Sequence, residues 1–510
     1  MEKVLILDFG SQYTQLIARK IRELRVYSEI FPFDFPLSRL KRARAGAIVL
    51  SGGPQSVYQK GAPFLTPEIF KMGIPILGIC YGLQLMAHLL GGKVLPSSKR
   101  EYGLARLQVL DRQGLLTGIK NNCQVWMSHG DRVEQVPEGF QVSGRTANCS
   151  AAVIESPSKR LYGIQFHPEV IHTKQGKKIL ANFLFKLAGL KPEWEMDSFL
   201  DRKIEEIRLQ VGSQKVICGL SGGIDSLVTA LIINRAIKNK LYCIFVDNGL
   251  LRRNQNHSLI TKLKKQFNLN ISEVKASQLF LEKLKRVTSP ERKRKIIGEQ
   301  FVRIFEKEAA KIGGIEFLAQ GTIYPDVIES NPVKGPSSRI KSHHNVGGLP
   351  CSIKFKLVEP LRELFKDEVR QLAEKLGLNQ DIIWQHPFPG PGLAVRIVGA
   401  VTPARLKLLR EADDILLQEI HQAGLYKKLW QAFAVLLPVK SVGVMGERRT
   451  YQSVVVIRLV RSVDGMTADW FPAPADLLAR ISTRIVNEVK GVNRVVYDIT
   501  NKPPATIEWE

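Results

Sequence analysis

Short apolar runs alternate with helix-like stretches along the first part of the chain. The apolar runs are Val4–Leu7, Ala47–Leu50, Ile76–Ile79 and Leu161–Phe166, and the helical stretches are Leu83–Leu90 and Lys177–Leu187. Because strands that alternate with helices favour a parallel sheet covered by helices, this pattern predicts an open, mostly parallel α/β domain. Residues 189–194, which include Gly189 and Pro192, then predict a linker.

The same alternation resumes after an amphipathic stretch, Phe199–Val211. Its predicted strands are Val216–Leu220, Leu241–Val246 and Phe317–Gln320, and its predicted helices are Leu227–Ala236 and the basic segment Lys283–Arg303. A second open, mostly parallel α/β domain follows from this order. Residues 331–350 are rich in Pro, Gly, Ser and His, which predicts a loop or lid.

The pattern changes at residues 386–392, where three prolines and two glycines in close succession forbid regular structure. A helical stretch (Arg405–Ala423) and strand-like runs (Ser453–Val460 and Val495–Ile499) follow without clear βαβ order. We therefore predict the fold class α/β, with two sheet domains at 1–191 and 192–385 and a small α+β domain at 386–510.

Composition adds limits on the class of protein. Hydrophobic residues make up 44% and charged residues 24% of the 510 residues, as in globular proteins that are soluble. No apolar run is long enough to span a bilayer, and no signal peptide is evident. Six scattered cysteines without a CxxC pair suggest reduced thiols, so we expect a cytoplasmic protein without membrane partners.

The net charge of +26 is compatible with nucleic-acid partners or with small anionic substrates. The alternative is a basic, solvated surface. Apart from a dense run at Lys283–Lys295, the cations are spread along the chain, and no nucleic-acid-binding motif is present. We therefore expect no nucleic-acid partner.

A cysteine stands between glycines directly after the strand Ile76–Ile79, in Gly78-Ile79-Cys80-Tyr81-Gly82. A nucleophile on a strand-to-helix turn needs small neighbours, because the backbone there is crowded. The helix N-terminus favours a thiolate, and the amide of Tyr81 would point toward a developing oxyanion.

A general base for this thiol is available in His167-Pro168-Glu169, with His167 as the base and Glu169 as the group that orients it. The glycine-rich turn Ser51-Gly52-Gly53-Pro54 follows another strand and is suited to donating amides. The alternative, a buried structural cysteine, is the commoner fate of a lone Cys. The glycine frame and the His–Glu pair weigh against it.

These segments together resemble the class I glutamine amidotransferases, in which a cysteine attacks the glutamine amide, forms a thioester and releases ammonia. The resemblance implies Cys80 as nucleophile, His167 as base and Glu169 as orienting residue. It also implies that Gly53 and Tyr81 supply oxyanion amides. The residues that it implies for holding glutamine are Gln84, Ser128, His129 and Asp131.

A second loop, Ser221-Gly222-Gly223-Ile224-Asp225-Ser226, lies between an apolar strand and a helix. It lacks the Gly-Lys-Ser/Thr ending of a Walker A loop, but glycines, hydroxyls and a helix N-terminus still suit phosphate. Asp225 is a candidate ligand for Mg²⁺ on phosphate oxygens. An ordinary serine–glycine turn is the alternative.

This loop resembles the signature of the PP-loop ATP pyrophosphatases, which adenylate an oxygen and release pyrophosphate. The resemblance implies a set of ATP-binding residues at the carboxyl edge of the second sheet. They are Ser221, Gly222, Gly223, Ile224, Asp225, Ser226, Leu227, Val246 and Gly321.

An amidotransferase followed by a PP-loop domain and a dimerisation domain is the order found in the GMP synthetase family. The chain resembles that family over its whole length, most specifically at residues 293–298, 320–330, 340–350, 386–392 and 502–510. The resemblance implies that XMP, ATP and glutamine give GMP, AMP, pyrophosphate and glutamate. It assigns XMP contacts to Arg294, Lys502, Ile507 and Glu508, and a lid to Lys341, His343 and His344.

The same resemblance implies a homodimer formed through the C-terminal domain, Mg²⁺ with ATP as co-substrate, and no organic prosthetic group. The His343–His344 pair has no metal-ligand partners at matching spacing, so we predict no zinc. The segment 502–510 is rich in apolar and aromatic residues, which suggests that it is ordered.

Two alternatives remain at this point. One is a PP-loop ligase with a different acceptor, such as a nucleotide or tRNA, against which the segment Lys502–Glu510 argues. The other is a non-catalytic protein, for example a nucleic-acid-binding one, on the same scaffold. The intact set of Cys80, His167 and Glu169 argues against that reading.

Overall fold

The computed structural model describes residues 2–253, 257–330, 355–445, 447–462, 465 and 467–510. These residues form two compact units, which divide between Ser198 and Phe199, within helix α5 (Met196–Val211). No helix among them is long and apolar enough to cross a bilayer. The division into three domains stays a prediction. The predicted lid, with Lys341, His343 and His344, lies outside the described residues.

The first unit is built on one sheet, with nine strands in the described residues. Their order across the sheet is β2 (Tyr27–Pro32), β1 (Lys3–Asp8), β3 (Ala45–Leu50), β4 (Ile76–Ile79), β9 (Leu161–Ile164), β8 (Val153–Ser156), β7 (Gln141–Arg145), β5 (Lys93–Val109) and β6 (Cys123–Gln135). The strands from β2 to β9 pair in parallel, as predicted, and those from β9 to β6 pair antiparallel. The parallel half ends at β9, beside the strand that leads to Cys80.

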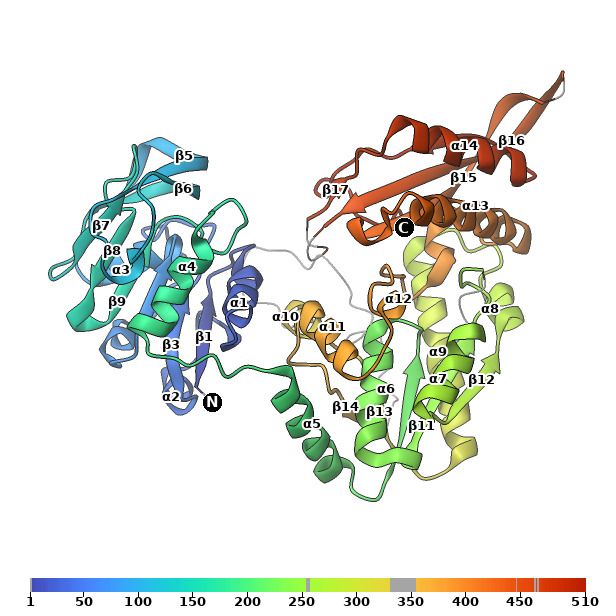
Figure 1. Ribbon diagram of the computed structural model, residues 1–510, viewed down its shortest axis with the longest axis horizontal. Coiled ribbons are helices and arrows are strands. Elements are labelled where there is room, and N and C mark those ends of the chain that lie inside the picture. Colours follow the sequence, from blue (N-terminus) through green and yellow to red (C-terminus); the bar gives the residue numbers. More distant parts are fainter. Residues whose placement is uncertain (1, 254–256, 331–354, 446, 463–464, 466) are drawn as a thin grey trace. The chain divides into compact units, whose positions relative to one another are not determined.

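Helices cover the parallel half of this sheet. They are α1 (Thr14–Arg22), α2 (Leu37–Arg42), α3 (Tyr81–Leu89) and α4 (Gly176–Ala181), the last continued by a π-helical segment, Asn182–Leu187. Helix α1 packs beside β1 and β2, and α3 packs on β4 and β9 (Figure 1). The core beneath them is made of aliphatic and aromatic side chains such as Leu5, Leu50 and Leu83.

The second unit contains a parallel sheet whose order is β12 (Ile271–Lys275), β11 (Leu241–Asp247), β10 (Lys215–Leu220), β13 (Ile315–Ala319) and β14 (Lys356–Val358). Its helices are α6 (Ile224–Ile237), α7 (His257–Phe267), α8 (Ser277–Lys283), α9 (Pro290–Ile312), α10 (Tyr324–Ser330), α11 (Lys366–Lys375) and α12 (Gln380–Ile383). Because crossovers between parallel strands are right-handed, α6 and α9, which lead in opposite directions along the sheet, cover opposite faces. Since β10, β11 and β13 run in parallel, their carboxyl ends meet at one edge of the sheet.

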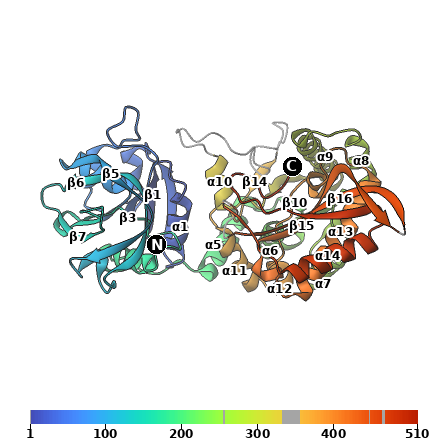
Figure 2. The ribbon, with the colours of Figure 1, turned by 90° about the horizontal axis from the view of Figure 1, so that it is seen from above.

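A smaller sheet completes the second unit. Its long strands β15 (Gln431–Met445) and β16 (Arg448–Arg461) are antiparallel, β17 (Asp469–Trp470) pairs with one end of β16, and β18 (Val492–Tyr497) pairs with β16 in parallel. Helices α13 (Pro403–Gln422) and α14 (Ala475–Glu488) pack on each other and against this sheet (Figure 2). This mixture agrees with the predicted α+β character.

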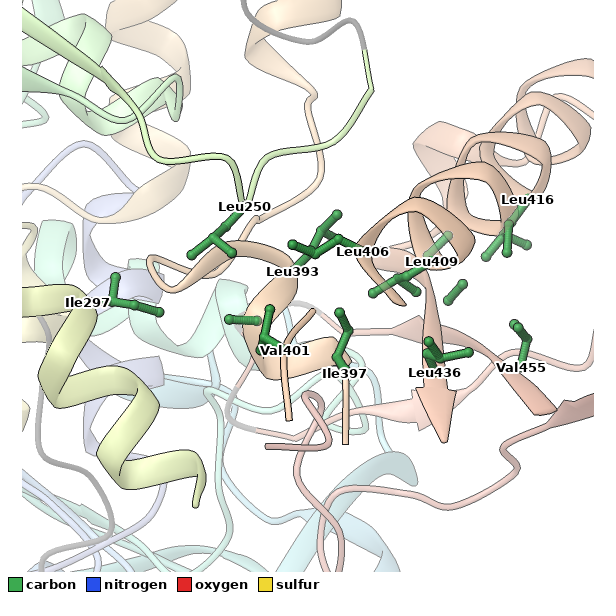
Figure 3. Packing of buried hydrophobic residues seen from close by; sticks show 14 of the residues in the cluster. Leu250, Ile297, Leu393, Ile397, Val401, Leu406, Leu409, Leu416, Leu436 and Val455 are labelled. Atoms are coloured by element: carbon green, nitrogen blue, oxygen red, sulfur yellow. The ribbon is translucent and has the colours of Figure 1, made fainter. Parts of the chain in front are cut away.

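One hydrophobic core runs through the second unit from the parallel sheet to the smaller sheet. Figure 3 shows Ile297 of α9 and Leu250 at one end, and Leu436 of β15 and Val455 of β16 at the other. Between them lie side chains from residues 393–401 and from α13. The Pro/Gly-rich segment that precedes residue 393 therefore leads into a packed region.

The single helix predicted over Lys283–Arg303 is wrong. Helix α8 ends at Lys283, and α9 begins only at Pro290. Ser289 caps α9 by accepting a hydrogen bond from the Arg292 amide at 3.5 Å, and proline favours the first helical position. The Ser-Pro pair was therefore a readable start signal that the basic pattern obscured.

Candidate functional site

Cys80 occupies a strained turn between β4 and α3. Its φ of +52° is unusual for a residue with a side chain, and its amide donates to the Ile164 carbonyl at 2.8 Å. Glycine is required on both sides, because a Cβ at Gly78 would lie 2.6 Å from the Leu83 nitrogen. A Cβ at Gly82 would lie 2.4 Å from the Leu50 oxygen. This geometry is the nucleophile elbow that the sequence predicts.

His167 and Glu169 form a buried pair beside this turn. The His167 amide donates to the Trp126 carbonyl at 3.0 Å, and Nδ1 lies 2.7 Å from Glu169 Oε1. Burial alone would lower the pKa of His167, but the charge of Glu169 and hydrogen bonds with Cys80 and Glu169 raise the pKa well above its ordinary value. The structure thus brings the thiol, imidazole and carboxylate together.

The glycine-rich turn after β3 is tied to the elbow. Ser51 Oγ accepts from the Phe9 amide at 3.0 Å, and the Ser51 carbonyl accepts from the Gly82 amide at 3.0 Å. Gly53 lies against Tyr81, since a Cβ there would be 3.1 Å from Tyr81 Cγ. The two residues expected to supply oxyanion amides are therefore neighbours.

Three of the residues expected to hold glutamine form one network with a fourth that was not expected. The Asp131 carbonyl accepts from Gln84 Nε2 at 2.9 Å and faces His129 Nδ1 at 2.8 Å. The hydroxyl of Tyr58 donates to Asp131 Oδ1 at 2.8 Å. Tyr58 is 47% exposed and does not belong to an apolar run, so the pattern of hydrophobic positions in the sequence does not single it out.

His129 also has a carboxylate on its other side. Its Nε2 lies 3.4 Å from Glu101 Oε2, and the Thr146 hydroxyl donates to Glu101 at 3.0 Å. Burial opposes ionisation of Glu101, but the nearby His129 and the hydrogen bond from Thr146 hold its pKa below the ordinary value. A charged carboxylate therefore supports the wall behind His129.

Gln165 is a second contact of Cys80 that sequence reasoning missed. Its Nε2 lies 3.6 Å from Cys80 Sγ, and the Ser128 carbonyl lies 3.7 Å from the same sulfur. A signal was present, because Gln165 is a polar residue at the end of an apolar run and two positions before His167.

The second loop lies at the carboxyl edge of the parallel sheet in the second unit. Gly222 has φ +82°, a conformation that glycine adopts without strain. Ser221 Oγ accepts from the Gly223 amide at 3.2 Å and lies 3.1 Å from Ser226 Oγ, whose hydroxyl donates to the Gly223 carbonyl at 2.9 Å. Ile224, Asp225, Ser226 and Leu227 form the first turn of α6. The loop therefore ends at a helix N-terminus, which favours an anion.

Asp225 faces a cation inside this loop. Its Oδ2 accepts from Lys366 Nζ at 2.6 Å, while its Oδ1 is buried and has no hydrogen-bond partner among the described residues. One unused carboxylate oxygen beside an anion-binding turn fits Mg²⁺, which keeps waters and binds through few carboxylates plus phosphate. The described residues contain no cluster of three or more His, Cys, Asp or Glu side chains that could hold a metal.

The other predicted ATP residues flank this loop. Val246 lies in β11 and Gly321 follows β13, the two strands that neighbour β10. Gly321 lies against the loop helix, since a Cβ would be 3.2 Å from Asp225 Cβ. The nearby Thr322 hydroxyl donates to Glu359 Oε1 at 2.6 Å. The structure thus collects these residues at one sheet edge.

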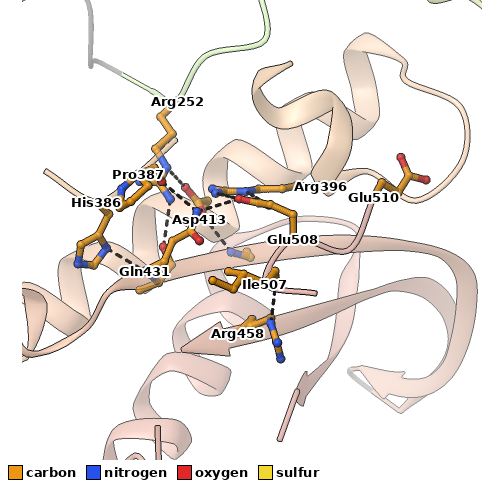
Figure 4. Close-up of polar contacts among 12 residues, drawn as sticks. Arg252, His386, Pro387, Arg396, Asp413, Gln431, Arg458, Ile507, Glu508 and Glu510 are labelled. Carbon is orange, nitrogen blue, oxygen red and sulfur yellow. Dashed lines mark hydrogen bonds and ion pairs between the residues drawn. The ribbon is translucent and has the colours of Figure 1, made fainter. Parts of the chain in front are cut away.

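Ile507 packs against the buried cluster of Phe433, Val435 and Val456, in agreement with the predicted apolar contribution, and charged side chains add further contacts to the segment after β18. Figure 4 shows Glu508 in a two-point contact with Arg396, whose Nε and Nη2 donate at 3.1 and 2.8 Å. Arg458 donates to the Ile507 carbonyl at 2.9 Å, and Gln431 donates to Glu508 at 2.8 Å. Arg396 and Arg458 are fully buried, so the first holds the segment through an ion pair and the second through hydrogen bonds to backbone carbonyls. The aromatic Trp509 remains 40% exposed.

Glu508 is ionised in this setting. Burial opposes its charge, but Arg396 and Gln431 hold its pKa below the ordinary value. Sequence reasoning missed both arginines. The available signal was an arginine inside an apolar run, as in Leu393–Val398 and Val454–Val460.

Arg294 and Lys502, the two other predicted XMP contacts, are both engaged. Arg294 donates to the Glu510 carbonyl, and its neighbour Lys293 pairs with the Glu510 carboxylate while donating to the Ile397 carbonyl at 2.7 Å. Lys502 donates to the Gly465 carbonyl at 2.7 Å. Helix α9 thus contacts Glu510, and Lys502 lies at the start of the segment that ends there.

Comparison with known proteins identifies the parts of the chain. Residues 5–187 match the family described as glutamine amidotransferase class-I. Residues 195–298 match NAD synthase, and residues 418–509 match the GMP synthase C-terminal domain.

Full-length relatives cover the whole chain. The glutamine-hydrolysing GMP synthase of Carboxydothermus hydrogenoformans is 56% identical over 508 residues, which cover 100% of this chain and 99% of the relative. That of Brachyspira hyodysenteriae is 55% identical over 510 residues, with the same coverage. With the thiol site and the anion loop both in place, the chain belongs to the family of glutamine-hydrolysing GMP synthases.

Proposed function

We propose that this enzyme converts XMP, ATP, glutamine and water to GMP, AMP, pyrophosphate and glutamate. The observation that carries the proposal is the presence, in one chain, of a thiol–imidazole–carboxylate site and an anion-binding loop on separate sheets. The first suits release of ammonia from an amide, and the second suits transfer of a nucleotidyl group.

In the first unit, Cys80 is the nucleophile on the glutamine amide carbon. His167 accepts the thiol proton and passes it to the departing nitrogen, so that ammonia leaves and a thioester forms. Water then attacks the thioester, and glutamate leaves with Cys80 restored. The amides of Gly53 and Tyr81 stabilise the oxyanion in both steps, and Glu169 stabilises the imidazolium.

We assign the binding of glutamine to Gln84, Ser128, His129 and Asp131. The network at the Asp131 carbonyl supports this assignment, because it fixes Gln84 and His129 next to the elbow. The Glu101 carboxylate behind His129 keeps that wall polar.

In the second unit, the 2-oxygen of XMP attacks the α-phosphorus of ATP and pyrophosphate leaves. Ammonia then attacks carbon 2, and AMP leaves with the oxygen. The loop residues from Ser221 to Leu227 hold the phosphates through amides and hydroxyls, while Val246 and Gly321 border the adenosine. Adenylation is needed because the unmodified oxygen on carbon 2 is a poor leaving group and AMP a good one.

Mg²⁺ would be held by Asp225 together with phosphate oxygens, and would neutralise charge on the leaving pyrophosphate. The unpartnered Asp225 Oδ1 supports this placement. No other metal and no prosthetic group enters the proposal.

We assign XMP binding to Arg294, Lys502, Ile507 and Glu508. The contacts of α9 with Glu510 support the assignment, since they bring Arg294 close to the segment that holds Ile507 and Glu508. Arg294 and Lys502 are suited to the phosphate of XMP.

The finer organisation is part of the same proposal. We place the amidotransferase domain at 1–191, the ATP pyrophosphatase domain at 192–385 and the dimerisation domain at 386–510. The enzyme acts in the cytoplasm as a homodimer. It has small-molecule substrates and no nucleic-acid or membrane partner.

Cys80→Ala tests the first half of the proposal. Glutamine-dependent GMP formation should fall to background, while GMP formation with an added ammonium salt should stay at the wild-type rate. Cys123→Ala, which changes a thiol away from the elbow, serves as the matched control and should retain both activities. Loss of both activities in Cys80→Ala would contradict the assignment of two separate sites.

A further inference from the structure

Two buried glutamine side chains link Cys80 to the rest of the glutamine site. We propose that Gln165 is a positioning residue for Cys80: its side-chain amide holds the sulfur and stabilises negative charge on it, and Gln84 sets the direction of that amide. This inference rests on the proposed role of Cys80 as nucleophile.

The contact is short and dry. Gln165 Nε2 lies 3.6 Å from Cys80 Sγ, within the range of an N–H···S hydrogen bond. Gln165 is 0% exposed and Cys80 is 5% exposed, so water does not compete for the sulfur. A hydrogen bond of this kind is stronger in a dry environment than at the surface.

The direction of the Gln165 amide follows from its neighbours. The Asp131 carbonyl can only accept a hydrogen bond, so the group that Gln84 presents to it at 2.9 Å must be Nε2. The same Nε2 donates to Gln165 Oε1 at 3.2 Å. With its oxygen occupied, Gln165 must turn Nε2 toward Cys80, and the sulfur therefore faces a donor.

This donor has a different role from that of His167. His167 also contacts Cys80, but it takes up and returns the thiol proton, so its hydrogen bond changes during turnover. The Gln165 amide does not titrate and remains a donor throughout. It would stabilise the thiolate before attack, and again when the C–S bond of the thioester breaks and the electron pair returns to sulfur.

The role of Gln84 is correspondingly double. The resemblance assigns Gln84 to glutamine binding, and its Nε2 also occupies the junction between Asp131 and Gln165. Removal of Gln84 should leave the Gln165 amide free to rotate. The hydrogen bond from Gln165 to the Cys80 sulfur should then weaken.

Alkylation of Cys80 by iodoacetamide tests the proposal on the full chain without glutamine. Gln165→Met keeps the length of the side chain but removes the donor, so the rate at pH 7 should fall roughly 10- to 100-fold, the effect of one hydrogen bond to a charged group. The pH at half-maximal rate should also rise. Gln108→Met, at an exposed glutamine in the same unit, is the matched control and should alkylate like wild type.

A double-variant cycle separates positioning from general loosening of the fold. Gln84→Met should lower the alkylation rate by less than Gln165→Met does. The double variant should match Gln165→Met alone, because both changes act through one hydrogen bond. Additive losses with an unchanged pH dependence would overturn the proposal.

Gln165→Glu covers the case in which the methionine variant folds poorly. It keeps the shape and the oxygen that accepts from Gln84, but its carboxylate has no donor for sulfur. Its alkylation rate should fall further below wild type as the new carboxyl ionises. A rate and pH profile equal to wild type would overturn the proposal.

The failure of this inference differs from the failure of the proposed function. If wild type hydrolyses glutamine and the Gln165 variants alkylate normally, only the positioning role is lost. If wild type shows no glutaminase activity although Cys80 alkylates, the proposed function itself fails.

Discussion

Two buried histidines in this chain have pKa values that their surroundings shift in opposite directions. His167 has the carboxylate of Glu169 at 2.7 Å, and its pKa is raised. No carboxylate in the described part of the chain pairs with His386: its Nδ1 accepts from the Ala432 amide at 3.2 Å, and its Nε2 donates to the Tyr426 carbonyl at 2.8 Å. Burial lowers the pKa of His386 to about 4. Their effects on stability should therefore have opposite signs.

The His167–Glu169 pair should stabilise the first unit most at low pH. The pKa of His167 in the folded state is raised, so its contribution is complete below the unfolded value of about 6.5 and is lost as pH rises through the folded value. The difference in urea midpoint between wild type and Glu169→Gln should therefore be larger at pH 6 than at pH 9. An equal difference at both values would show that charge on His167 is not involved.

His386 should make the second unit sensitive to acid. Its folded pKa of about 4 lies below the unfolded value, so the unfolded chain takes up the proton first and stability falls as pH decreases from about 6.5. Between pH 6.5 and 4 the loss is up to about 3 kcal/mol. His386→Gln should flatten this dependence in urea unfolding, whereas His172→Gln, at an exposed position, should leave it unchanged.

At the scale of elements, the turn from β4 to α3 depends on the close approach of backbone to backbone. Gly82→Ala should lower the thermal midpoint of the first unit and slow alkylation of Cys80, because the new Cβ would lie 2.4 Å from the Leu50 carbonyl oxygen. Overpacking of this kind costs roughly 1–3 kcal/mol. Gly130→Ala is the matched control, since its Cβ would meet its nearest neighbour at 3.6 Å. Equal behaviour of the two variants would contradict this account of the elbow.

The elements that carry both loops were predictable from the sequence, because each loop follows a short apolar strand and precedes a helix. The antiparallel half of the first sheet was not predicted. Strand β5 contains Pro96 and a series of charged residues, and about half of those side chains whose burial is described face water, so no clear apolar run marks it. Likewise β15 is interrupted by Pro438.

The candidate sites were predictable to the extent that the chemistry lies in contiguous motifs. The sequence alone identifies Cys80, His167 and the Ser221–Ser226 loop, because glycines, a base and hydroxyls occur there at fixed spacing. Gln165, Arg396 and Arg458 do not, because each acts through a partner that is remote in sequence. A buried polar residue inside an apolar run is the only local trace that such a contact leaves.

At the scale of the whole molecule, the described residues fall into two compact units with separate cores. We expect calorimetry to resolve two transitions that single substitutions move one at a time. Gly82→Ala should shift only the transition of the first unit. Glu508→Leu should lower only the transition temperature of the second unit. The loss in free energy of unfolding should be about 3–5 kcal/mol, since the change leaves Arg396 buried without its partner. A single transition moved by both would contradict the independence of the units.

The charge pairs in the second unit also have a consequence for how fast it folds. Arg396 is 112 residues from Glu508, and Lys293 is 217 residues from Glu510. Contacts between residues so far apart in the sequence form slowly during folding. Until they form, Arg396 and Lys293 must stay hydrated, because burial of an unpaired cation is costly. Refolding of the second unit should therefore lag behind refolding of the first.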